Sequence, residues 1–171
     1  ENLGLEPSEI ARRVDDVLAA LGLEHLRYRP LASLSGGEKQ KAVIAGVLAL
    51  RPRILVLDEP SSELDPASAD DFFSLLSGLQ QRLGLTVILI EHRIERVVGL
   101  VDRLVLLDDG RIVADGRPDE VLDSHESGRL GIGIPPVARL AQALRARGLW
   151  SGVLPATVEQ AHSALGPVLR A

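Results

Sequence analysis

Cysteine is absent from this sequence of 171 residues, which excludes disulfide bonds and thiolate metal sites and fits a cytosolic protein. Aromatic residues make up only 2% of the chain, although hydrophobic residues as a whole make up 46%. The core must therefore consist of Leu, Val, Ile and Ala, a composition that suits parallel strands covered by helices on both faces. No apolar run approaches the ~18 residues that a membrane-spanning helix needs. The longest candidate, residues 42–50, stops at Arg51-Pro52.

Lysine is also scarce, because only two of the 19 basic residues are lysines and the others are arginines. The formal net charge is −5, and the arginines are scattered among acidic residues without forming a basic tract. An acidic chain of this kind has no general electrostatic attraction to nucleic acid or anionic lipid. We therefore expect no nucleic-acid partner.

The segment Ser35-Gly36-Gly37-Glu38 has the pattern of a capped helix start, with Ser35 as the N-cap and Glu38 completing a capping box. Two glycines at a helix start also present free amide groups at the positive end of the helix dipole, which is a ready site for an anion. Capping alone is the commoner explanation of an isolated motif. A strand that ends in carboxylates shortly afterwards favours a phosphate contact in addition to capping.

That strand is predicted over Ile54–Asp58, a short apolar run followed by Glu59 and Pro60. Carboxylates at the end of an apolar strand are costly unless they meet a cation or a reacting group. Asp58 can hold Mg²⁺, usually through water, because this ion keeps part of its hydration shell. The adjacent Glu59 can orient or deprotonate an attacking water molecule.

A second apolar strand, Thr86–Glu91, follows a helix that we expect over residues 66–83. Strand, helix and strand in this order predict a βαβ unit with parallel strands. His92 then lies at the carboxyl end of the second strand, the edge at which open α/β sheets bind ligands, whereas Glu91 is expected to be structural. Asp65 has two interpretations that stay open here: it caps the helix that follows, or it also belongs to a binding loop.

The other predicted elements follow from apolar periodicity and from glycine and proline positions. Asp109-Gly110 is the strongest hairpin signal in the chain. The predictions are helices over residues 8–21, 38–50 and 93–101, a hairpin with strands 103–108 and 111–114, a helical turn over 118–122, a linker over 124–136, and helices over 137–147 and 157–169.

The run from Leu34 to Gln40 and the run from Ile54 to Pro60 together resemble the signature motif and the Walker B motif of ATP-binding cassette (ABC) ATPases. The resemblance covers roughly residues 2–122 and implies an α/β, P-loop NTPase-like domain that binds ATP and Mg²⁺. It implies contact with the γ-phosphate of ATP held by the opposite subunit for the signature residues Ser35, Gly36, Gly37 and Glu38.

The same resemblance assigns roles to the residues after the Walker B strand. It implies that Asp58 is the Mg²⁺ residue, Glu59 the catalytic base, and His92 the switch histidine that contacts the γ-phosphate. Residues 61–65 look like the D-loop of the family, and Asp65 aligns with the aspartate of that loop, so Asp65 is a further nucleotide-site residue.

A finer likeness is to the ATPases of energy-coupling factor importers, and it rests on residues 1–5, 42–49 and 90–95. The tail, with residues 136–141 and 154–159, looks like the C-terminal extension of that class. The likeness implies uptake of a metal ion or vitamin, a second ABC ATPase subunit in a homodimer or heterodimer, and integral membrane transport subunits. It implies a peripheral location at the cytoplasmic face of the cell membrane.

The sequence also lacks parts that the family needs. A phosphate-binding P-loop closes in Gly-Lys-Ser/Thr, yet neither Lys39 nor Lys41 follows a glycine, and no glutamine precedes Gln40 to supply a Q-loop. The chain begins at Glu1 and contains no methionine. We therefore expect the C-terminal part of a longer ATPase, inactive by itself, with a partly open sheet that associates through its bare edge.

The expected domains are an incomplete ABC ATPase domain over residues 1–123, a linker over 124–136 and a small helical C-terminal extension over 137–171. Within the first, the helical subdomain covers about 1–50, and part of the mainly parallel sheet of the catalytic core lies in about 51–123.

Two alternative functions come from other classes. One is an ABC ATPase of DNA maintenance or of ribosomes, but the long coiled-coil insertions or second cassettes typical of those proteins are not in this sequence. The other is an ATP-silent interaction module. Retention of Asp58, Glu59 and His92 argues against it, because a silent site has no physical need for charged groups at a strand end.

Overall fold

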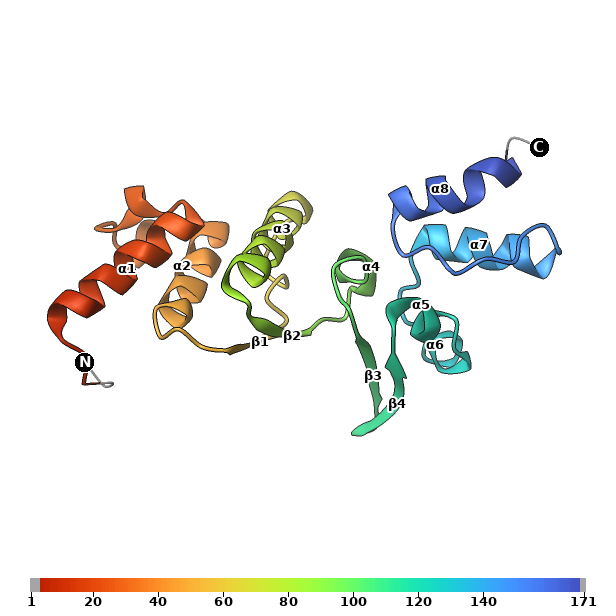
Figure 1. Cartoon of the computed structure of the whole chain (residues 1–171), viewed down its shortest axis with the longest axis horizontal. Helices are drawn as coiled ribbons and strands as arrows, with labels where there is room; N and C mark the ends of the chain where they lie inside the picture. The colour runs from red at the N-terminus through yellow and green to blue at the C-terminus, as the bar shows by residue number, and fades with distance from the viewer. Residues whose placement is uncertain (1–3, 170–171) are drawn as a thin grey trace. The chain divides into compact units, whose positions relative to one another are not determined.

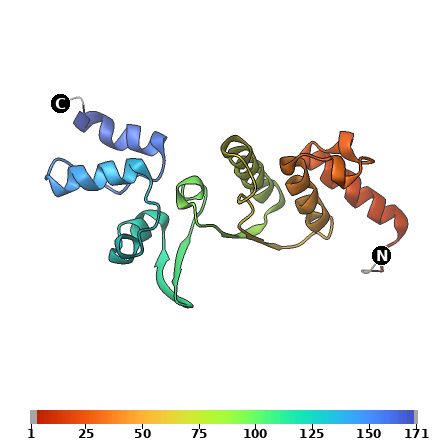
Figure 2. The same ribbon diagram turned by 180° about the vertical axis from the view of Figure 1, so that it is seen from behind.

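The computed structural model describes residues 4–169, and within this range the chain forms two compact units that divide between Glu91 and His92. The first unit therefore covers residues 4–91 and the second covers residues 92–169. Part of the likeness to importer ATPases rests on Glu1, Asn2 and Leu3, which lie outside the described residues. Figures 1 and 2 show the elements of each unit.

The first unit contains four helical segments before its first strand, and then a strand, a helix and a strand. In chain order they are α1 (Pro7–Leu21), the 3₁₀ turns η1 (Glu24–Leu26) and η2 (Leu31–Ser33), α2 (Gly36–Leu48), β1 (Ile54–Asp58), α3 (Pro66–Leu83) and β2 (Thr86–Ile90). The helix ends follow from local chemistry. Gly22 and Gly84 adopt left-handed φ angles of 67° and 62° after α1 and α3, a conformation that glycine takes without steric cost.

The predicted βαβ unit is confirmed. Strands β1 and β2 pair in parallel, with Ile54 opposite Thr86 and Asp58 opposite Ile90, and they form a two-stranded sheet within the described residues. Helix α3 connects them and buries Phe72 and Leu79, each at most 2% exposed.

The expectation that helices cover both faces of these strands is wrong for the first unit. Side chains alternate along a strand, and the face that carries Leu55 is buried, with Leu55 only 2% exposed. The opposite face carries Val56 and Ile88, which are 58% and 49% exposed. A continuous apolar run does not show which face its own chain covers, and here one face is bare.

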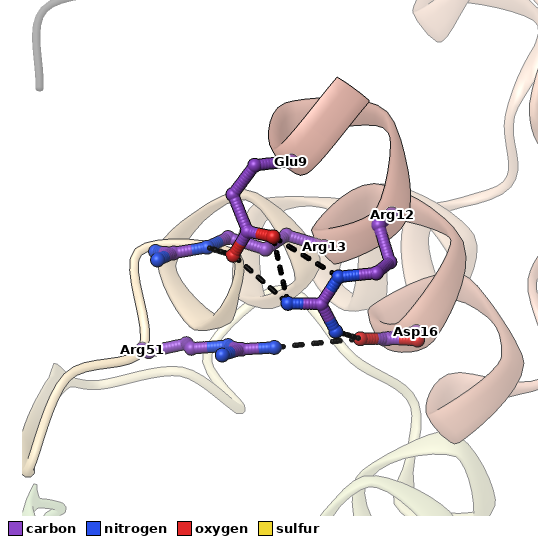
Figure 3. A network of polar contacts seen from close by, with 5 residues as sticks. All are labelled: Glu9, Arg12, Arg13, Asp16 and Arg51. Atoms are coloured by element: carbon purple, nitrogen blue, oxygen red, sulfur yellow. Dashed lines mark hydrogen bonds and ion pairs between the residues drawn. The ribbon is translucent and has the colours of Figure 1, made fainter. Parts of the chain in front are cut away.

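The polar face of α1 carries a network of ion pairs that reaches the segment before β1 (Figure 3). Arg12 and Arg13 donate hydrogen bonds of 2.7 Å to the two carboxylate oxygens of Glu9. Asp16 accepts from Arg12 at 3.2 Å and from Arg51 at 3.5 Å. The bonds from Arg13 and then Arg12 lower the pKa of the Glu9 carboxyl from 4.5 to about 2, because they stabilise its charged form.

The second unit combines a hairpin with short helices. Its elements are α4 (Ile94–Val97), β3 (Leu104–Asp108), β4 (Arg111–Gly116), α5 (Pro118–Leu122), α6 (His125–Leu130), α7 (Pro136–Ala146) and α8 (Val158–Leu169). The predicted hairpin is confirmed, and Asp109 and Gly110 turn the chain with φ angles of 44° and 73°.

One apolar cluster joins these elements, and its buried members come from the hairpin, from four of the helices and from the segments beside them. Its buried members are Ile94, Val98, Leu106, Val121, Leu122, Ala141, Leu144, Leu154, Ala161 and Leu165. Trp150 packs against the cluster from a partly buried position. The second unit therefore encloses a core of its own.

The predicted linker over residues 124–136 is partly helical, because α6 occupies residues 125–130. The Ser124 hydroxyl accepts a 3.3 Å hydrogen bond from the Ser127 amide and so caps the helix. Ser127 is fully buried and its hydroxyl donates to the Val121 carbonyl. The glycine and proline positions predict a linker, but Gly131 ends α6 with a left-handed φ of 60°. None of the helices within residues 4–169 is long and apolar enough to cross a membrane.

Candidate functional site

The capping box at the start of α2 is present. The Glu38 amide donates a 3.3 Å hydrogen bond to the Ser35 hydroxyl, and the Ser35 amide donates a 2.7 Å bond to the Glu38 carboxylate. The bond from the Ser35 backbone, followed by one with its side chain, lowers the pKa of Glu38 and keeps it charged. Sequence reasoning identified this cap correctly.

Gly36 and Gly37 form the first helical positions after this cap. Neither has a positive φ angle, and a Cβ added to either would meet no atom within 4 Å. The described chain therefore does not itself require glycine at these two positions. Amides in the first turn of a helix have no intrahelical partner, so the turn offers hydrogen-bond donors beside two positions that no side chain crowds.

The two carboxylates of the predicted Walker B motif lie at the end of β1, and both are exposed. Asp58 is the last residue of the strand and lies opposite Ile90 of β2. Glu59 leaves the strand with a φ of 44°, in the left-handed region that few non-glycine residues adopt. Its amide donates a 2.9 Å hydrogen bond to the Ile90 carbonyl, which places Glu59 at the carboxyl ends of both strands.

Two contacts that sequence reasoning missed hold the turn after Glu59. The Gln40 side-chain amide, one turn into α2, donates a 2.9 Å bond to the Pro60 carbonyl. Ser61 donates to Glu91 Oε1 from its hydroxyl at 2.7 Å and from its amide at 3.2 Å. Gln40 and Pro60 are 20 residues apart in the chain, and Ser61 and Glu91 are 30 residues apart. No local sequence pattern predicts these contacts. They join α2, the end of β1 and the end of β2.

Asp65 caps α3, as one of its two interpretations requires. Its carboxylate accepts bonds from the amides of Ala67 and Ser68, both at 3.1 Å, and from the Ser68 hydroxyl at 2.5 Å. The Ser68 hydroxyl, and then the Ser68 amide, lower the pKa of Asp65. A contact of Asp65 with nucleotide stays a prediction.

His92 is exposed and begins the second unit, directly after Glu91. Its assignment as the switch histidine also stays a prediction. The first unit therefore holds Ser35, Gly36, Gly37, Glu38, Asp58, Glu59 and Asp65, which is every predicted site residue except His92.

Comparison with known proteins adds an independent observation. The model of the ABC transporter family matches residues 1–62, which contain both motifs. The energy-coupling factor transporter ATP-binding protein EcfA1 of Caldanaerobacter subterraneus is 43% identical over 150 residues, which are 87% of this chain and 54% of that protein. This chain belongs to the ABC transporter ATPase family.

The similarity of this ABC ATPase chain to energy-coupling factor proteins extends through its tail. EcfA2 of Clostridium perfringens is 35% identical over 172 aligned residues, which span 99% of this chain and 60% of that protein. The ABC chain thus spans just over half the length of these curated relatives.

Solved structures agree with the α/β, P-loop NTPase-like fold. Clostridium perfringens cbiO1, described as part of the ABC transporter complex cbiONQ, has a TM-score of 0.68 at 35% identity. It covers 82% of this chain, which in turn covers 57% of that protein. The ADP conformation of MJ1267, an ATP-binding cassette, also has a TM-score of 0.68, at 31% identity. The predicted fold class is confirmed.

The donor set of the site fits ATP and Mg²⁺. Open amides at a capped helix start suit phosphate oxygens. Within residues 4–169, no group of three or more His, Asp or Glu side chains could hold a metal by itself. Mg²⁺ commonly takes one or two carboxylates together with substrate phosphates and water, and Asp58 can supply such a carboxylate.

Proposed function

We propose that this chain is part of an ATP-binding and ATP-hydrolysing subunit of an ABC importer that takes up a metal ion or a vitamin. The subunit pairs with a second ABC ATPase subunit, and the two sandwich ATP and Mg²⁺ between them. It works with integral membrane transport subunits at the cytoplasmic face of the cell membrane. Closure of the ATP sandwich and hydrolysis drive those membrane partners.

One observation supports this proposal above the others. A capped, glycine-bearing helix start and a strand end with two carboxylates lie in one compact unit, and Gln40 of that same helix is bonded to Pro60 after the strand. Gly36 and Gly37 have no steric reason for being glycine within the described chain. The close approach of a phosphate group provides one, because a bare backbone lets the ligand reach the amides.

The residues divide the chemical work between them. The Gly36 and Gly37 amides donate hydrogen bonds to phosphate oxygens of the nucleotide held by the partner subunit. Asp58 would hold Mg²⁺ through its carboxylate, and the bound ion would neutralise charge on the phosphates. Glu59 accepts a proton from the attacking water or orients it. His92 donates a hydrogen bond to the γ-phosphate.

This 171-residue chain should not hydrolyse ATP by itself, because its sequence contains no Gly-Lys-Ser/Thr segment. The direct test is to sequence the coding DNA upstream of the Glu1 codon, in frame, and then to assay the complete subunit. We expect a Gly-x-x-x-x-Gly-Lys-Ser/Thr segment followed by a glutamine loop. We also expect ATP hydrolysis that depends on Mg²⁺, and uptake of a metal ion or vitamin by vesicles that hold the subunit with its membrane partners.

A stop codon followed by a start codon near Glu1 would instead favour the ATP-silent interaction module. Hydrolysis without any membrane partner or uptake would favour a non-transport ABC ATPase.

A further inference from the structure

Ser61 donates two hydrogen bonds to the same carboxylate oxygen of Glu91. Both the hydroxyl and the amide of Ser61 donate to Glu91 Oε1, at 2.7 Å and 3.2 Å. Ser61 is 2% exposed and is one of only two buried polar residues within residues 4–169. Hydrogen bonds to a carboxylate are stronger than those between neutral groups, so this pair is a firm connection between β2 and the turn after β1.

The turn that Ser61 belongs to carries Glu59. The Ser62 amide donates to the Glu59 carbonyl at 3.1 Å, and the Leu64 amide donates to the Ser61 carbonyl at 3.1 Å. The left-handed φ of 44° at Glu59 is unfavourable for a residue with a Cβ. Such a conformation persists only where the surrounding structure holds it. Ser61 is two residues away and is the buried anchor of the same turn.

We propose that Glu91 is a positioning residue for Glu59, acting through Ser61. The inference rests on the proposed function and deepens it. Glu91 holds Ser61 with two bonds, Ser61 holds the turn, and the turn fixes the direction in which the Glu59 carboxylate leaves β1. The role of Glu91 is therefore geometric, and it acts through its two bonds with Ser61.

The second oxygen of Glu91 supports a role beyond stability. Within the described residues, Oε2 is buried and has no hydrogen-bond partner, a state that is unfavourable for a polar atom. A glutamine side chain at this position could accept the two hydrogen bonds from Ser61 without introducing a charge into a partly buried site. The carboxylate gives stronger bonds to Ser61, and therefore a stiffer turn, at the expense of an unsatisfied atom.

The test uses the complete subunit and measures kcat and KM for ATP hydrolysis. Glu91→Ala removes both bonds and should lower kcat about 10- to 100-fold, since a catalytic group displaced by about 1 Å can cost that much. The KM for ATP should stay within about 3-fold of the wild-type value. The substitution does not change the interactions that bind ATP equally in the ground state and in the transition state. Glu91→Gln keeps an oxygen for Ser61 and should stay within about 5-fold of the wild-type kcat. Asp71→Asn is the control, an exposed carboxylate on α3 that lies outside the predicted site, and it should leave both constants unchanged.

Two further variants separate positioning from general damage. In a Glu59→Gln background, Glu91→Ala should produce no additional loss, because there is no base left to position. Ser61→Ala keeps the amide bond and should lower kcat less than Glu91→Ala does. Hydrogen exchange of the peptide over residues 59–64 should speed up in Glu91→Ala and stay unchanged in Asp71→Asn.

The outcomes also separate this inference from the proposed function. A wild-type subunit that does not hydrolyse ATP overturns both. Hydrolysis that Glu59→Gln abolishes and Glu91→Ala leaves intact overturns the positioning role alone. An equal loss in Glu91→Ala and Glu91→Gln, or a further loss in the Glu59→Gln background, also contradicts action through Ser61 on Glu59.

Discussion

The two compact units differ in how they use their apolar residues. The second unit packs its hairpin and helices around a closed cluster, in which Leu122 and Leu165 are 0% and 1% exposed. The first unit buries one face of β1 and β2 and leaves Val56 and Ile88 exposed on the other. The hairpin of the second unit also exposes Leu107 and Ile112, at 66% and 63%, so the units differ in where the bare apolar surface lies. In the first unit it lies on the sheet whose end carries the predicted site carboxylates.

Their polar contacts also differ. Both units carry exposed ion pairs, such as Arg12 with Glu9 in the first and Arg103 with Asp115 in the second, both at 2.7 Å. Exposed pairs of this kind contribute little to stability. The first unit in addition places two partly buried contacts, Ser61 with Glu91 and Gln40 with Pro60, beside its carboxylates. Buried polar contacts rigidify a structure, so these two contacts fix the geometry of the site.

The largest stability effect is expected in the closed core of the second unit. Leu122→Ala removes a fully buried side chain and should lower the free energy of unfolding by about 2–5 kcal/mol. Leu140→Ala is the control, because Leu140 is 43% exposed and should cost less than about 0.5 kcal/mol. The unfolding of this unit in urea can be followed by the fluorescence of Trp150, the single tryptophan, which packs against the cluster. Equal effects of the two variants would contradict a closed core.

A matched pair on one strand tests the bare face of the first unit. Leu55→Ala should cost about 2 kcal/mol or more, because Leu55 is buried. Val56→Ala should cost less than about 0.5 kcal/mol in the 171-residue chain. The measurement is denaturant unfolding followed by circular dichroism.

The same pair sharpens the comparison in the complete subunit. If further sheet and helices cover this face there, Val56→Ala should become costly, by about 1 kcal/mol or more. A small cost in both proteins would show that the face stays exposed.

The smallest effect concerns the ion-pair network on α1. Glu9 has a pKa lowered from 4.5 to about 2 by Arg13 and Arg12, so its contribution to stability is complete above about pH 4.5. It should decline as the pH falls towards 2 and vanish below it, because protonation removes the charge that both arginines bind. Urea midpoints between pH 6 and pH 2 should therefore fall more steeply for wild type than for Glu9→Gln. Parallel curves would contradict the role of this carboxylate.

Local chemistry predicted much of the fold. The capping box at Ser35, the Asp65 cap, the Asp109-Gly110 turn and the limits of β1 all follow from residues adjacent in the chain. The pairing of β1 with β2 followed from the order of strand, helix and strand. Each of these depends on interactions over a few residues or on a strong topological rule.

Long-range features could not be predicted in the same way. The bonds from Ser61 to Glu91 and from Gln40 to Pro60 join residues 30 and 20 positions apart, and nothing in either segment specifies its partner. The composition predicts that β1 and β2 are buried on both faces, but Val56 and Ile88 are exposed. Composition cannot show which element covers a given face. Helix α6 was missed because Gly128 and Gly131 suggested a linker, although Gly131 is the C-cap of that helix.

We propose that the exposed carboxylate after β1 serves ATP hydrolysis, and one measurement tests this role most directly. The rate of ATP hydrolysis by the complete subunit should be compared between wild type and Glu59→Gln, with Asp71→Asn as control. Loss of the general base should slow turnover by about two to four orders of magnitude, while the control stays at the wild-type rate. Unchanged hydrolysis in Glu59→Gln would contradict the account.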